Sequence, residues 1–178
     1  MDVGCELHGY ASDLTRTWPI TGHFSAAQEE LYELILETNK KCITLCKSGA
    51  DIRQIHSISD KMLRKGLKHL GILNDEESEL YNKLNPTSIG HYLGMDVHDC
   101  SLVSYNNSLK PGVVLTIEPG IYIPSNFECP ERYRGIGIRI EDEVLITDAG
   151  NEILTASMPK EVKHIQSLLS NYTFASLR

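Results

Sequence analysis

The stretch "GVVLTIEPGIYI" (Gly112–Ile123) alternates in hydropathy as a β-strand does, yet it carries the carboxylate of Glu118 inside an apolar run. Burying a carboxylate without a partner costs several kcal/mol, so this side chain needs a cation or a hydrogen-bond donor. A Pro-Gly pair follows it directly. The chain must therefore fold so that a compensating group meets Glu118 in the interior.

A second alternating run, "GIGIRIEDEVLIT" (Gly135–Thr147), also carries an acid, Glu141. Because side chains alternate between the two faces of a strand, Arg139 and Glu141 share one face, as Thr116 and Glu118 do in the first run. An acid on a strand face usually points to solvent, and that reading holds for any one of these acids taken singly. Glu118 is the exception, because its surroundings are apolar.

Residues 2–18 are predicted to form a β-hairpin with its turn at "ELHG". A turn centred between Leu7 and His8 places Asp2 directly opposite Asp13. The Cβ atoms of such a pair lie about 5 Å apart, and like charges that close are destabilising. The pair therefore indicates that a cation lies between the two carboxylates.

The remaining segments are predicted to be helical. Ser25 with Gln28 forms a capping box that opens a helix closed by Gly49, and a second helix runs from Asp51 to Gly71. The segment "NDEESELYNKLN" predicts a short helix, and "SMPKEVKHIQSLL" predicts a last one capped by Ser157. A hairpin, two long helices, an antiparallel sheet and a closing helix favour an α+β domain spanning residues 1–178.

Composition excludes several classes of partner. Hydrophobic residues make up 41% and charged residues 23%, an ordinary globular balance. A net charge of −7 without a Lys/Arg cluster argues against a nucleic-acid or anionic-membrane surface, and no apolar run is long enough to span a membrane.

Five cysteines without disulfide-like spacing favour free thiols in a reducing compartment. Cys42 and Cys46, one helical turn apart, lack a second ligand pair and are predicted to be core residues.

The segment "HYLGMDVHD" supplies two imidazoles, His91 and His98, for the predicted cation site. One imidazole with four carboxylates is an oxygen-rich ligand set that suits Mn²⁺, Mg²⁺, Co²⁺ or Fe²⁺ better than a thiolate-selecting ion. Four acids would over-neutralise one divalent ion, so two ions sharing bridging carboxylates fit the charge. Two such ions, about 3.5–4 Å apart, can hold a bridging hydroxide and polarise a carbonyl. The spacing of the two histidines alone does not say which one is a ligand.

Four segments, "MDVGCELHGYASDLTRTWP", "HYLGMDVHD", "LTIEPGIYIP" and "YRGIGIRIEDEVLIT", resemble the metal-site segments of the pita-bread metallopeptidases. Within that superfamily they are similar to the Xaa-Pro aminopeptidase (aminopeptidase P) branch, including its plant mitochondrial intermediate-cleaving members. The resemblance runs from Met1 to about Leu169. It implies a pita-bread fold, two divalent ions, Mn²⁺ above all, and an N-terminal peptide bond of a peptide or protein as substrate. It also implies a mitochondrial location, with a cytoplasmic one as the alternative, and is compatible with a homo-oligomer.

The resemblance assigns a role to each candidate residue. It makes Asp2 and Asp13 the ligands of one ion, His91 and Glu118 the ligands of the other, and Asp13 and Glu141 the bridging carboxylates. It makes His98 the group that stabilises the oxyanion and Glu118 the proton shuttle. It makes Arg139 the residue that orients the acids through charge-assisted hydrogen bonds.

Two departures from the family pattern accompany the resemblance. Relatives carry a histidine four residues before the metal-binding histidine, where this chain has Thr87, which bears on any preference for proline. The family's catalytic domain begins before Asp2 and follows a separate N-terminal domain, so we expect the chain to be an N-terminally truncated product. The alternative function is a non-catalytic pita-bread module that binds protein partners, and retention of all five ligands argues against it.

Overall fold

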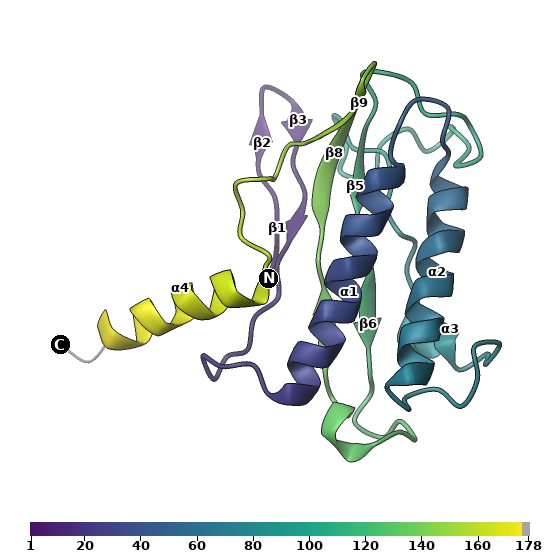
Figure 1. Ribbon diagram of the computed structural model, residues 1–178. Coiled ribbons are helices and arrows are strands. Elements are labelled where there is room, and N and C mark those ends of the chain that lie inside the picture. The colour runs from purple at the N-terminus through teal and green to yellow at the C-terminus, as the bar shows by residue number, and fades with distance from the viewer. Residues whose placement is uncertain (176–178) are drawn as a thin grey trace.

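The computed structural model describes residues 1–175, and Figure 1 shows helix α1 crossing in front of the central strands with α2 beside it. The short strands of the N-terminal hairpin stand at one edge. The helices are α1 (Ala26–Leu45), α2 (Ile52–His69), α3 (Tyr81–Leu84) and α4 (Val162–Ala175), with one 3₁₀ turn at Glu131–Tyr133. No helix in this described part of the chain is both long and apolar enough to cross a membrane.

Every strand pairing among the described residues is antiparallel, as the sequence predicts. β1 pairs with β4, β2 with β3, β6 with β7, and β5, β8 and β9 form a three-stranded sheet. The strands are β1 (Asp2–Val3), β2 (Glu6–Leu7), β3 (Tyr10–Ala11), β4 (Leu14–Thr15), β5 (Val114–Ile117), β6 (Gly120–Tyr122), β7 (Gly137–Arg139), β8 (Asp142–Thr147) and β9 (Gly150–Ile153). The predicted α+β class is confirmed.

The two long predicted strands are each broken, and both breaks lie at the same level. The first run divides into β5 and β6 around Glu118, and the second divides into β7 and β8 around Glu141. Ile117 lies opposite Asp142 on one side of the break and Gly120 lies opposite Arg139 on the other. The register is therefore unchanged through the break, which places Glu118 opposite Glu141.

The predicted register of the N-terminal hairpin is wrong by two residues. Asp2 lies opposite Thr15, not opposite Asp13. The turn is centred between His8 and Gly9, whose φ angles of 55° and 85° are those of a two-residue hairpin turn with both central residues left-handed. Because side chains alternate along a strand, a shift of two residues leaves Asp2 and Asp13 on the same face.

Helix α1 lies between two adjoining clusters of buried side chains. One cluster packs α1 against α2, β6 and β7, and the other packs the end of α1 and the start of α2 against β5 and β8. Cys42 and Cys46 are fully buried in the second cluster, as predicted, and burial raises the pKa of each thiol to about 12. The long helices thus support the strands from one face, where Ile117 and Ile140 are buried, while alternation turns Glu118 and Glu141 to the opposite face, which lines the cleft.

The last helix begins later than the sequence predicts. Ser157 lies in a turn, and α4 starts at Val162. The guanidinium of Arg16 accounts for this, because it holds the preceding segment in a non-helical conformation. It donates to the carbonyl oxygens of Met158, at 3.0 Å, and Pro159, at 3.1 Å. Those carbonyls point at Arg16 and not along a helix axis.

The cap of α2 yields a stability prediction. Asp51 Oδ1 accepts a hydrogen bond from the Gln54 N–H at 2.8 Å. We expect Asp51→Ala to lower the free energy of unfolding by about 1 kcal/mol, since the N–H loses its partner. Chemical denaturation measures this loss. Asp51→Asn, which retains a capping oxygen, is the matched control, and equal losses in both variants would contradict the capping role.

Candidate metal centre

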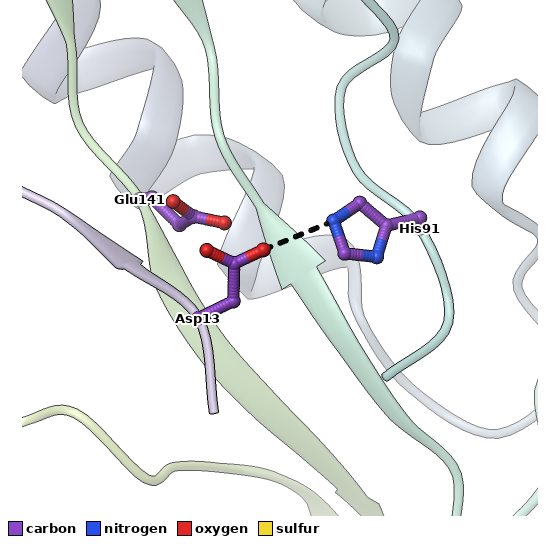
Figure 2. Close-up of side chains that lie close together, drawn as sticks. All are labelled: Asp13, His91 and Glu141. Carbon is purple, nitrogen blue, oxygen red and sulfur yellow. Dashed lines mark ion pairs between the residues drawn. The ribbon is translucent and has the colours of Figure 1, made fainter. Parts of the chain in front are cut away.

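Three side chains from distant parts of the chain converge beside the strand breaks, as Figure 2 shows. Asp13 comes from the junction of β3 and β4, His91 from the loop that precedes β5, and Glu141 from the break between β7 and β8. One potential ligand atom from each lies within 4.8 Å of the others. His91 and Glu141 are buried, and Asp13 is largely so.

The ring of His91 is oriented by its neighbours. Its Nδ1 lies 3.0 Å from the carbonyl oxygen of Tyr92, and a carbonyl can only accept, so Nδ1 carries the proton. The other nitrogen, Nε2, lies 3.3 Å from Asp13 Oδ2 and 3.3 Å from Glu118 Oε1 and is the one positioned to bind a metal. Metal-binding histidines are held in this way, with the other nitrogen donating to a carbonyl or carboxylate.

Glu118 and Glu141 differ in how their oxygens are satisfied. Glu118 Oε1 accepts a hydrogen bond from Thr116 Oγ1 at 3.2 Å. Glu141 Oε1 is buried, and no hydrogen-bond donor contacts it among the described residues. A buried carboxylate oxygen without a partner needs a cation or a donor. Two further carboxylates and an imidazole nitrogen lie beside it, and together these groups can bind a divalent cation. The donor set therefore fits a metal.

Asp2 lies at the edge of this group, paired with Arg139. The Arg139 guanidinium donates from Nη2 to the Asp2 carboxylate and from Nη1 to the Tyr122 hydroxyl at 3.2 Å, and its Nε lies 3.9 Å from Glu118 Oε2. The Asp2 side chain is 58% exposed and does not belong to the close group of Asp13, His91 and Glu141. Arg139 therefore touches two of the predicted ligands, as an orienting residue would.

A cleft of about 770 Å³ opens over the group. His98 lines it, and its exposed ring meets the His91 ring edge to face with the centroids 4.4 Å apart. The Asp99 carboxylate shapes the loop that carries His98 by accepting from the Met95 N–H at 3.0 Å. The cleft is lined by all the predicted site residues, Asp2, Asp13, His91, His98, Glu118, Arg139 and Glu141, and by Thr87.

Sequence reasoning missed the residues that support the ligands. Glu143 Oε1 accepts the Asp13 N–H at 2.7 Å, and the Thr116 hydroxyl accepts the His91 N–H at 3.1 Å. Glu143 lies two residues after Glu141 and Thr116 two residues before Glu118. Alternation already places Thr116 on the face of Glu118, and the same alternation applied to Glu143 would have placed it on the face of Glu141.

Residues 1–148 match the family model of metallopeptidase family M24. The chain belongs to this family. It is 65% identical to the mitochondrial Intermediate cleaving peptidase 55 of Arabidopsis thaliana over 172 residues, and 45% identical to human Xaa-Pro aminopeptidase 3 over 175 residues. These alignments cover 97% and 96% of this chain but 34% of each relative, so the chain spans about a third of their length.

Solved structures of Escherichia coli aminopeptidase P match the M24 chain closely. A low-pH form superposes with a TM-score of 0.90, and a zinc-substituted form in complex with product superposes with a TM-score of 0.88. Both are 42% identical and cover 96% of this chain and 40% of the other. Aminopeptidase P has the pita-bread fold, so the fold and the family resemblance read from the sequence are confirmed.

The crowded acids of this M24 site raise one another's affinity for protons. Burial raises the pKa of Glu118, and the Asp13 charge adds to that effect, while His91 and Arg139 oppose it. Burial raises the pKa of Glu141 to about 8, and the charges of Glu118 and Asp13 add to it. Without a cation, Glu141 therefore holds a proton at neutral pH, and a bound metal would displace it.

This shift predicts how the metal-free protein responds to pH. Between its ordinary value and about 8, Glu141 ionises only in the unfolded chain, so its stabilising contribution is complete below the ordinary value and is lost as the pH rises through about 8. Glu141→Gln cannot ionise. We expect it to raise the melting temperature of the chelator-treated protein at about pH 9 more than at about pH 5.

Thermal unfolding in excess chelator at the two pH values measures this effect. Glu152→Gln is the matched control, because Glu152 is exposed on β9 and far from the cleft lining. A Glu141→Gln difference that is the same at both pH values would contradict the raised pKa.

Proposed function

We propose that this chain provides the metal centre of an aminopeptidase that hydrolyses the N-terminal peptide bond of peptides or proteins with two divalent ions. The observation that carries the proposal is the convergence of one oriented imidazole with buried carboxylates, one of which has an unpartnered oxygen, in an open cleft. Relatives named Xaa-Pro aminopeptidase and intermediate cleaving peptidase support the reaction class.

The resemblance to the family implies how the ligands divide between two ions. Asp2 and Asp13 would hold one ion, His91 and Glu118 the other, with Asp13 and Glu141 bridging. Four carboxylates leave a single divalent ion with excess negative charge, whereas two ions balance it. The oxygen-rich set suits Mn²⁺, Mg²⁺, Co²⁺ or Fe²⁺, and the family resemblance implies Mn²⁺ above all. When bound, such a pair of ions lowers the pKa of water and polarises a substrate carbonyl.

The chain's own residues then move the protons. Glu118 faces the cleft with a raised pKa, which suits a group that takes a proton from the attacking water and passes it to the leaving amine. The exposed ring of His98 projects into the same cleft and can donate a hydrogen bond to the oxyanion that forms at the carbonyl. Arg139 holds Asp2 at the edge of the group.

The substrate and its location follow from the relatives. We infer an intracellular peptide or protein N-terminus as substrate, in mitochondria by likeness to a peptidase named as mitochondrial. Thr87 lines the cleft with a small hydroxyl side chain, so the wall near the scissile bond offers no imidazole at this position. A strict requirement for proline in the second position of the substrate is therefore not expected.

Metal stoichiometry tests the ligand assignment. We expect the purified chain in Mn²⁺ buffer to bind about two ions, and Asp13→Ala to lose the pair because both ions use this carboxylate. Mass spectrometry of metals after desalting measures the content. Asp75→Ala, at an exposed acid outside the cleft lining, is the control. A folded wild type without bound metal would overturn the proposal.

Peptide hydrolysis tests the reaction itself. We expect the metal-loaded chain to release the first residue from free but not acetylated N-termini, with or without proline in second position. His98→Ala should lower kcat by about 100-fold while leaving the metal content unchanged, because a donor to the oxyanion is lost. His69→Ala, at an exposed histidine that ends α2, is the control. A metal-loaded chain without activity would favour the non-catalytic, partner-binding alternative.

A further inference from the structure

The break in the strands leaves one carbonyl without its ladder donor. The Ile140 N–H donates to the Pro119 carbonyl at 3.3 Å, so residues 119 and 140 stand in a hydrogen-bonded position of the antiparallel ladder. The return bond requires an N–H on residue 119, and proline has none. The Ile140 carbonyl belongs to a fully buried residue, where an unpaired polar group is costly.

Asn39, in the middle of α1, supplies the missing donor. Its Nδ2 lies 3.3 Å from the Ile140 carbonyl oxygen and 3.0 Å from the Ile117 carbonyl oxygen. Both bonds span long stretches of sequence, and Asn39 is fully buried. Ile117 and Ile140 are the residues immediately before Glu118 and Glu141. One side-chain amide therefore joins the two strands at the level of the two carboxylates.

The orientation of this amide is itself fixed. The Lys160 ammonium donates to Asn39 Oδ1 at 2.8 Å and to Asp142 Oδ2 at 2.7 Å. Asp142 Oδ1 accepts from Arg16 Nη2 at 2.9 Å, and Arg16 also donates to the Glu141 carbonyl. With its oxygen held by an ammonium, the amide must turn its two N–H groups toward the strands. Every polar atom of the Asn39 side chain is satisfied.

We propose that Asn39 is a positioning residue for the metal centre, which sets the spacing of Glu118 and Glu141 by standing in for the N–H that Pro119 lacks. Asparagine is a poor helix former, and a buried amide is costly unless satisfied, so neither α1 nor its packing accounts for it. The need for a hydrogen-bond donor at the strand break does account for an asparagine at this position. The inference rests on the proposed function only in that it takes the two glutamates as metal ligands.

Asn39→Leu tests the proposal, because leucine has the same branched shape without donors. We expect Mn²⁺ affinity to fall by about tenfold or more, as when an outer-shell partner of a ligand is removed. We also expect the exchange-coupled Mn²⁺ pair seen by electron paramagnetic resonance to give way to the signal of isolated ions. Thr38→Val is the matched control, since Thr38 is equally buried on α1 but its hydroxyl bonds only the Leu34 carbonyl.

A second substitution separates positioning from packing. Pro119→Ala restores a backbone N–H opposite the Ile140 carbonyl. The double variant Asn39→Leu/Pro119→Ala should regain much of the affinity and the coupled signal, whereas a loss caused by packing alone would persist. Absence of rescue would overturn the stand-in role, and wild-type affinity and coupling in Asn39→Leu would overturn the proposal altogether.

A measurement on the metal-free protein keeps the two proposals distinct. The Glu118 N–H donates to the Ile89 carbonyl at 2.7 Å and the Glu141 N–H to the Thr15 carbonyl at 3.1 Å. Hydrogen exchange at these amides should be faster in Asn39→Leu than in Thr38→Val. If the wild type binds no metal, the proposed function fails while this arm still decides for or against Asn39. Should Asn39→Leu not fold, Lys160→Met serves in its place. It removes the ammonium that fixes the orientation of the Asn39 amide, and it must give the same faster hydrogen exchange at the two glutamate amides.

Discussion

Glu118 and Glu141 face each other across two antiparallel strands, and the repulsion between them governs how the rest of the site is built. Like charges directly opposite on a sheet are destabilising. The fold meets this cost with the imidazole of His91 and the guanidinium of Arg139, which both oppose the rise in the pKa of Glu118, and with a proton on Glu141 in the absence of metal. It leaves one oxygen of Glu141 unsatisfied, which only a bound cation would complete. A metal bound at Glu141 would therefore displace a proton.

Local signals in the sequence were sufficient for the helices and for the class of the fold. Capping residues mark the starts of α1 and α2, and alternation marks the strands. The errors came from features that local pattern does not contain. The hairpin register depends on two left-handed residues, His8 and Gly9, and the non-glycine member gives no warning of that conformation. The start of α4 depends on Arg16, which is distant in the sequence.

The candidate site was predictable to the extent that strand faces are. Glu118 could be predicted as a site residue because it lies in an apolar run, and Glu141 and Arg139 could be placed on one face by alternation. Alternation could not decide whether His91 or His98 is the ligand, because both lie in one irregular segment. In the structure His91 is buried and its Nδ1 bonds the Tyr92 carbonyl, whereas His98 is exposed, and this difference favours His91 as the ligand. Asn39 escaped notice because its role exists only once α1 lies across the strand break at Pro119, which is distant from Asn39 in the sequence.

The candidate ligands come from two parts of the fold. The N-terminal hairpin is largely exposed, and it is tied to the sheets by the bond from the Glu141 N–H to Thr15, the bond from the Asp13 N–H to Glu143, and the pairing of Asp2 with Arg139. The buried ion pair of Arg16 with Asp142 adds to these contacts where the hairpin ends. A metal shared by Asp13, His91 and Glu141 would add a cross-link between the hairpin, the loop before β5 and the sheet. Because a ligand that binds only the folded arrangement stabilises it by mass action, docking of the hairpin and metal binding are one coupled equilibrium. Any change that loosens the hairpin must therefore weaken metal binding, even where no ligand is touched.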